Sequence, residues 1–153
     1  MSAHAATHGV EIKVTRFPST TRTAQDAARE IGCEVAEIVK SLVFLADDAP
    51  VVVLCSGADR VDEAKLNAAL GASATRRATA NEAKSATGYA IGGVPPFGHD
   101  ADLRVVIDDG LLEFATVWAA AGLPDAVFPI APADLVRLSQ ATVADISLPH
   151  DAR

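Results

Sequence analysis

The stretch IVKSLVFLADDAPVVVLC, residues 38–55, decides the fold. It holds two apolar runs rich in β-branched residues, Ile38–Ala46 and Pro50–Cys55, and two aspartates lie between them. Runs of this length and composition, bounded by turn-forming residues, are typical of strands that are covered on both faces. The stretch therefore predicts two buried strands, and the segments on either side of it define the remainder of the fold.

Helix-capping residues occur on both sides of these strands. Thr23, Asp62 and Thr79 each precede a segment with helical character, and Thr79 begins a capping box with Glu82. A glycine follows each of these three segments, as expected at a helix C-terminus. Pro132 is at a favourable first position for a fourth helix. The predicted helices cover residues 24–31, 63–70, 80–87 and 132–139.

Further strands are predicted over Leu103–Asp108, Ala126–Ile130 and Thr142–Ile146, and Asp109-Gly110 is a strong turn signal. Residues 111–121 are ambiguous, because their alanines favour a helix whereas Val117 and Trp118 suit a strand. Interspersed strands and helices indicate an α/β or α+β fold with a mixed sheet or partly closed barrel and surrounding helices. No linker is evident, so we expect one domain over residues 23–147, with an N-terminal extension (1–22) and a C-terminal tail (148–153).

Composition narrows the function classes. The chain has 153 residues, of which 50% are hydrophobic, and this excludes intrinsic disorder. No apolar run is long enough to span a membrane, and we expect no secretory signal, because the N-terminus has neither a basic nor an apolar region of the required kind. The net charge of −7 argues against a protein that coats nucleic acid through a basic face. Two cysteines, Cys33 and Cys55, suit the small core residues of a cytoplasmic protein in a reducing compartment.

Lys40 is unusual because it lies within an apolar strand, where an unpaired ammonium is costly to bury. One interpretation is a lysine whose aliphatic stem reaches solvent, and this is the more common situation. The other is a cation that a rigid strand holds at the floor of a pocket, aimed at an anion or a polarised carbonyl.

The segment GGVPPFGH, residues 92–99, cannot form a regular element. It is either a tight connection or a rigid loop whose glycines let a ligand approach the backbone. His99 could titrate near neutral pH, although a lone histidine beside a loop is more often a surface or capping group. The sequence has no metal-ligand spacing, no GxSxG elbow, no P-loop and no GxGxxG after a strand, so we expect no metal or redox cofactor.

Several motifs in order resemble the YbaK/prolyl-tRNA synthetase-associated domain family: KSLVF at 40–44, GxxRVDxxKL at 57–66, TGYxIGGVxPFG at 87–98, VID at 106–108 and PxDL at 132–135. The resemblance covers residues 23–146. It implies a free-standing relative of the editing insertion of bacterial prolyl-tRNA synthetase. Such proteins hydrolyse the ester bond between a tRNA, commonly tRNA(Pro), and an amino acid that was wrongly attached to it.

The resemblance also implies roles for residues. Lys40 would be the essential lysine that holds the terminal adenosine or its phosphate, and Gly92 and Pro96 match a Gly-x-x-x-Pro motif. Backbone groups around Gly92, Gly93 and Val94 would orient the aminoacyl group and the attacking water. Cysteine-specific members carry a phenylalanine, a serine and an aspartate at positions that correspond to substrate-binding candidates here, so alanine, serine or threonine is the expected amino acid. Those three candidates are Thr23, Ala120 and Val127.

The expected partner is the acceptor end of an aminoacyl-tRNA, with a synthetase as a further candidate and neither membrane nor DNA. Among the basic residues at 60–84, Arg76 and Arg77 are candidate tRNA contacts, as is His99, although solvated surface explains such pairs equally well. Two alternatives stay open: a non-catalytic tRNA-binding or synthetase-associated module of the same fold, and a hydrolase of small acylated nucleotides.

Overall fold

Two long antiparallel strands form the centre of the computed structural model, which describes residues 9–10, 12–17, 23–99, 103–123 and 125–149. β2 (Val39–Ala46) and β3 (Ala49–Ser56) pair over their whole length. The turn between them places Asp47 and Asp48 at positive φ, a region that aspartate tolerates better than most residues. Most of β3 is fully buried, so the two predicted strands are confirmed.

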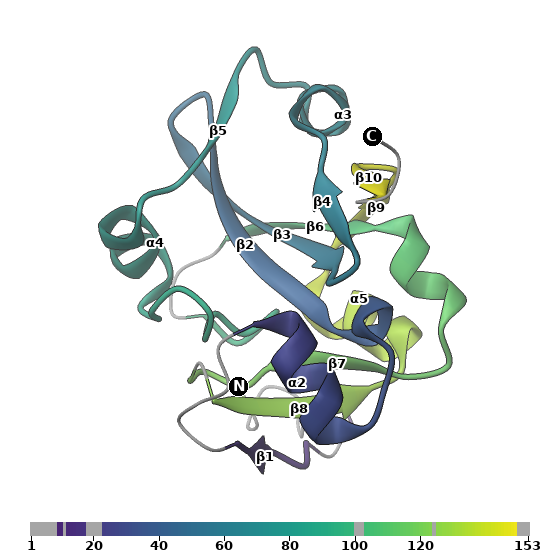
Figure 1. The fold of residues 1–153 in the computed structure, drawn as a ribbon. Helices are drawn as coiled ribbons and strands as arrows, with labels where there is room; N and C mark the ends of the chain where they lie inside the picture. The colour runs from purple at the N-terminus through teal and green to yellow at the C-terminus, as the bar shows by residue number, and fades with distance from the viewer. Residues whose placement is uncertain (1–8, 11, 18–22, 100–102, 124, 150–153) are drawn as a thin grey trace.

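This pair belongs to a mixed five-stranded sheet in the order β5-β2-β3-β6-β9. The strands β3, β6 and β9 are parallel to one another. Two smaller antiparallel sheets, β1-β8-β7 and β10-β4, complete a single α+β domain (Figure 1). The strands outside the central pair are β1 (Thr15–Arg16), β4 (Asp59–Val61), β5 (Thr75–Arg77), β6 (Arg104–Asp108), β7 (Val117–Ala120), β8 (Ala126–Ile130), β9 (Thr142–Ala144) and β10 (Ser147–Pro149).

The four predicted helices are confirmed: α2 (Ala24–Ile31), α3 (Glu63–Leu70), α4 (Ala80–Thr87) and α5 (Pro132–Ser139). Thr23, Asp62 and Thr79 accept backbone N–H groups at the first turns of α2, α3 and α4, and Thr79 and Glu82 form the expected capping box. The glycines after these three helices adopt the left-handed conformation. None of the helices in the described ranges is long and apolar enough to cross a membrane.

The strand β6 ends at Asp108, in agreement with the turn signal at Asp109-Gly110. The buried Asp108 carboxylate accepts the N–H of Gly110 (3.1 Å) and that of Ile146 (3.0 Å), and the chain continues as a 3₁₀ helix, η2 (Asp109–Glu113). The ambiguous remainder is β7, not a helix. Its residues alternate between buried and half-buried, and pairing with β8 outweighs the helix propensity of the alanines.

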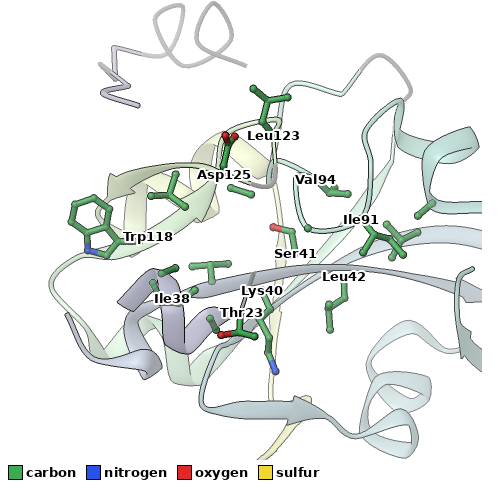
Figure 2. Close-up of a pocket in the computed structure, with 18 of the residues that line it drawn as sticks. Thr23, Ile38, Lys40, Ser41, Leu42, Ile91, Val94, Trp118, Leu123 and Asp125 are labelled. Carbon is green, nitrogen blue, oxygen red and sulfur yellow. The ribbon is translucent and has the colours of Figure 1, made fainter. Parts of the chain in front are cut away.

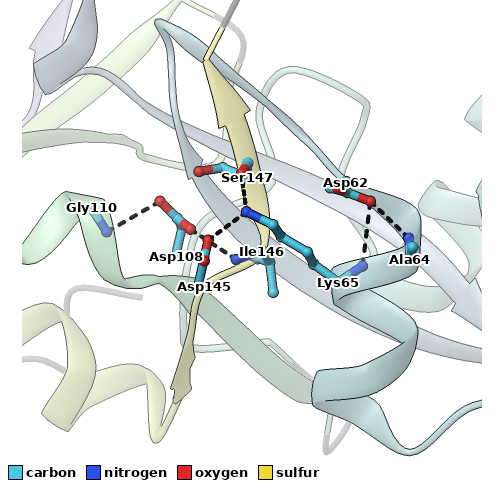
Figure 3. Close-up of polar contacts among 8 residues, drawn as sticks. All are labelled: Asp62, Ala64, Lys65, Asp108, Gly110, Asp145, Ile146 and Ser147. Atoms are coloured by element: carbon cyan, nitrogen blue, oxygen red, sulfur yellow. Dashed lines mark hydrogen bonds and ion pairs between the residues drawn. The ribbon is translucent and has the colours of Figure 1, made fainter. Parts of the chain in front are cut away.

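A polar cluster joins α3 to the last strands of the chain (Figure 3). The Lys65 ammonium donates to the Asp145 carboxylate and to the Ser147 carbonyl, both at 3.0 Å, while Asp62 caps the same helix. Carboxylate oxygens of Asp108, Asp109 and Asp145 lie within 4.8 Å of one another. Since Asp108 accepts two backbone amides and Asp145 pairs with Lys65, this cluster holds the fold together.

Candidate functional site

A gap in the edge of β2 opens the main cavity. At one end of the gap Ile38 bridges to Trp118 of β7, and at the other the Ala78 N–H donates to the Val43 carbonyl (3.0 Å). No strand among the described residues covers the edge between these two points. Because alternate residues of a strand turn their backbone groups to the same edge, the N–H and C=O of Ser41 face the gap together with those of Val43.

The cavity measures about 730 Å³ and is lined from β2, α2, β7, β8 and the loop after α4 (Figure 2). Such a volume suits a small molecule or the end of a larger one. Most of its wall is apolar, and Ile91 and Leu123, about half exposed, flank its mouth. The polar and charged side chains that line it are Arg16, Thr23, Lys40, Ser41, Arg77 and Asp125.

Lys40 lies in the wall of this cavity, but its ammonium points away from the side on which Ser41 projects (Figure 2). The Nζ atom donates to the Asp59 carbonyl of β4. There it lines a second, smaller cavity of about 260 Å³ together with Arg60, Arg77 and the carboxylate-bearing Glu63. Lys40 and Arg77 line both cavities, so the cationic part of the site borders the apolar part.

The Gly/Pro loop after α4 is irregular, as predicted, and divides into lining and supporting residues. Gly92 and Val94 line the main cavity, and the positive φ of Gly92 (88°) explains the glycine there. Gly93 and Pro96 are buried behind them and are not in the cavity wall; the Gly93 N–H donates to the Ala90 carbonyl (3.0 Å).

His99 supports the loop and lies outside both cavity walls. Its Nε2 is 2.6 Å from the Pro95 carbonyl, and its ring meets the edge of the Tyr89 ring with centroids 6.4 Å apart. The neighbouring Phe97 ring packs against Phe128 of β8 at a centroid distance of 5.9 Å. These contacts hold the loop from the side opposite to the cavity.

The three candidates for substrate binding that lie outside the loop all line the cavity. Ala120 and Val127 are direct partners in the β7–β8 pairing, and Thr23 contributes from the N-terminus of α2, where its hydroxyl also accepts the Asp26 N–H (3.1 Å). The structure thus brings together residues more than 100 positions apart. All three are small or aliphatic except for the single hydroxyl of Thr23.

The basic residues between 60 and 84 separate into paired and unpaired side chains. Arg76 forms a bidentate pair with Glu82 (2.8 and 2.7 Å), Lys65 pairs with Asp145, and Lys84 caps α4 by donating to the Gly88 carbonyl (3.0 Å). Within the described ranges, Arg60 and Arg77 have no carboxylate partner, although the Arg77 guanidinium lies 6.0 Å from the centre of the Phe44 ring. Arg60 and Arg77 are the two that line the smaller cavity.

The Glu82 carboxyl group allows a prediction of how the stability of the fold depends on pH. The hydrogen bond from Arg76, helped by the Thr79 N–H, lowers the pKa of Glu82 from 4.5 to about 2. A carboxyl group whose pKa is lower in the folded state stabilises the fold above its unfolded pKa, and this contribution is lost as the pH falls from about 4.5 towards 2. In Glu82→Gln the melting temperature should therefore decline less steeply in this window than in the wild type. Thermal melts at pH 6 to 2 measure it, with exposed Glu63→Gln as control; equal slopes would contradict it.

The cysteines supply no nucleophile. Burial raises the pKa of the Cys55 thiol to about 12. The pKa of the Cys33 thiol is also raised, again chiefly by burial. Both thiols are therefore protonated at neutral pH, and neither lines either cavity. Both agree with the expected role as small core residues.

Sequence reasoning missed Ser41, Trp118 and Asp125 as cavity residues. A signal for Ser41 existed, since a serine next to Lys40 in an apolar strand must face the opposite side of the sheet. Asp125 pairs with Arg16 (2.9 Å), which lowers the pKa of its carboxyl group. No signal in the sequence singles out Asp125, because its position depends on the β1–β8–β7 pairing.

Comparison with known proteins identifies the family. A model of the aminoacyl-tRNA editing domain matches residues 18–138. A crystal structure of a candidate trans-editing enzyme for prolyl-tRNA synthetase superimposes with a TM-score of 0.90 and 42% identity, covering 96% of this chain and 94% of the other. The Bacillus subtilis (strain 168) protein YwhH, which is uncharacterized, is 34% identical over 130 residues, or 84% of this chain and 82% of its own.

A proline--tRNA ligase of Ligilactobacillus salivarius is 40% identical over 87 residues, which is 57% of this chain but 15% of the ligase. The match therefore lies in one part of a much larger enzyme. With the family model covering most of the chain and the fold shared over nearly its whole length, this protein belongs to the aminoacyl-tRNA editing domain family, as the resemblance predicted.

Proposed function

We propose that this protein hydrolyses the ester bond of a mischarged aminoacyl-tRNA in trans, with tRNA(Pro) carrying a small non-cognate amino acid as its substrate. The observation that carries the proposal is the apolar cavity of about 730 Å³ beside a cationic cavity, in a chain of the aminoacyl-tRNA editing family. The aminoacylation site of a prolyl-tRNA synthetase is sized for proline and cannot strongly exclude smaller amino acids by binding alone. A separate hydrolytic site can remove the amino acids that are attached in error.

The chemistry requires little from the protein. Water attacks the carbonyl carbon of the ester, the bond to the ribose oxygen breaks, and the proton lost by the water goes to that oxygen. The products are the free amino acid and the tRNA. Since an aminoacyl ester is already activated, orienting it against Gly92 and Val94 and polarising it can supply the catalysis without a nucleophilic side chain.

The smaller cavity fits the phosphodiester next to the terminal adenosine. Lys40, Arg60 and Arg77 line it, and guanidinium and ammonium groups are the usual ligands of phosphate oxygens. With the phosphate there, the esterified ribose can reach the apolar cavity, because Lys40 and Arg77 line both. Such a small set of cations agrees with a net charge of −7 and with contacts confined to the acceptor end.

Arg76 and Arg77 are adjacent in the sequence, but we expect their replacement to have different effects on tRNA binding. Arg77→Gln should raise KM for charged tRNA several-fold with kcat little changed, and should reduce the slope of log affinity against log salt by about one. Arg76→Gln should leave KM near the wild-type value, because Arg76 is already paired with Glu82. Steady-state kinetics at two salt concentrations measure both variants. An equal change of KM in both variants would show that the smaller cavity does not bind tRNA.

The proposed function is tested by deacylation of tRNA(Pro) charged with alanine, serine, threonine or proline. We expect turnover of the non-cognate esters and none of prolyl-tRNA(Pro). Binding without turnover of any ester would identify a non-catalytic module. Equal kcat/KM for charged tRNA and for a short aminoacylated oligonucleotide would identify a hydrolase of small acylated nucleotides.

A further inference from the structure

Ser41 carries a hydroxyl group that the fold does not use. Its Oγ atom is buried and has no hydrogen-bond partner in the described part of the chain. A buried hydroxyl without a partner is unfavourable relative to an apolar side chain of the same size. An alanine would fit the strand equally well, so the Ser41 hydroxyl group is available to a ligand.

The surroundings of this hydroxyl direct it to a ligand. Ser41 projects from β2 into the main cavity, on the side where Val94, Leu123 and Asp125 lie (Figure 2). The backbone edge of β2 at the same residue is uncovered, since β5 pairs only with the later residues Phe44–Ala46. The mostly apolar wall of the cavity therefore gains a hydroxyl group and open backbone groups at Ser41, in addition to its other polar and charged side chains.

The depth of Ser41 decides which part of a substrate it meets. Ile91 and Gly92 are exposed at the mouth of the cavity, whereas the Ser41 Oγ is buried. When the ester is oriented against Gly92 at the mouth, as proposed above, the amino-acid side chain is the part that extends deeper into the cavity. The group that reaches Ser41 is then the side chain, not the ester or the ribose.

We infer that Ser41 is a specificity-determining residue whose hydroxyl hydrogen-bonds to the side-chain hydroxyl of a threonyl or seryl ester. This inference rests on the proposed function for the site and adds the class of amino acid. Val43 and Val94 beside it provide an aliphatic surface for the methyl group of threonine. A pocket that supplies a hydrogen bond to a hydroxyl group rejects the isosteric side chain without one, because the pocket's own polar group then stays unpaired.

Threonine and valine are isosteric and give the sharpest comparison. The wild type should hydrolyse threonyl-tRNA(Pro) about tenfold faster than valyl-tRNA(Pro) in kcat/KM, the value of one neutral hydrogen bond. Ser41→Ala should lower the threonyl rate about tenfold and leave the valyl rate unchanged or higher, because alanine has no hydroxyl group that valine would leave unpaired. Thr75→Val is the matched control, because Thr75 also has a buried, unpartnered hydroxyl but lines neither cavity. It should keep the wild-type preference.

Binding of hydrolysis-resistant amide analogues, threonyl- and valyl-amino-deoxyadenosine, gives a second readout by calorimetry. A preference for the threonyl analogue that Ser41→Ala abolishes supports the inference, even for a chain that shows no turnover and so contradicts the proposed function. Hydrolysis of both esters at equal rates by the wild type keeps the proposed function and overturns the inference. An equal loss on both esters in Ser41→Ala also overturns it, since Ser41 would then contact a group common to all substrates.

Discussion

Replacing Lys40 by methionine should lower kcat/KM for deacylation by at least about 100-fold and leave the fold intact. Removing a single electrostatic stabiliser commonly has an effect of this size, and misplacing an ester by about 1 Å adds to it. Methionine keeps the part of the stem that packs in the cavity wall while it removes the ammonium bound to the Asp59 carbonyl. Single-turnover deacylation measures the loss, and circular dichroism reports the fold.

Lys84→Met is the matched control. Lys84 is exposed, caps α4 and lines neither cavity, so its replacement removes the same charge from the same net total without touching the site. Near-wild-type turnover in a folded Lys40→Met variant would remove Lys40 from the mechanism. Equal losses in both variants would attribute the effect to overall charge.

The second large effect concerns stability. Phe128→Ala should lower the free energy of unfolding by about 4 kcal/mol, because Phe128 is fully buried in the main hydrophobic cluster and its deletion leaves a large void. The change also removes the edge contact with Phe97 of the Gly/Pro loop. Urea denaturation measures the loss, and faster hydrogen exchange at Gly93 and Val94 would show that the loop loses its support.

Phe128→Leu separates the two contributions. It keeps most of the buried volume but lacks the aromatic edge contact, so its destabilisation should stay below about 1.5 kcal/mol. Loop exchange as fast as in Phe128→Ala would then attribute loop order to the aromatic pair. Unchanged exchange at Gly93 and Val94 in both variants would show that Phe97 does not hold the loop.

The sequence by itself determined the elements whose causes are local. A cap and its amide lie within three residues of each other, as in Thr79 and Glu82, so the helix boundaries follow from neighbouring residues. The strands at 38–55 follow from a run of β-branched residues whose burial needs no knowledge of the partner strand. The same locality identified Lys40 as unusual, since a charged residue conflicts with an apolar strand, and showed that the Gly/Pro segment 92–99 is irregular.

Only the tertiary structure decided which groups share a site. The short strands β4, β5 and β10 have little apolar pattern and exist because of their partners, and β7 became a strand because β8 pairs with it. The cavity is a gap between β7 and β5 along β2, and no local pattern encodes such a gap. Arg76 and Arg77 are adjacent in sequence, yet alternation along β5 pairs one with Glu82 and places the other beside Lys40. Ser41 and Lys40 lie on opposite faces of β2, and the environment of each is likewise fixed by long-range contacts, because it depends on what covers that face.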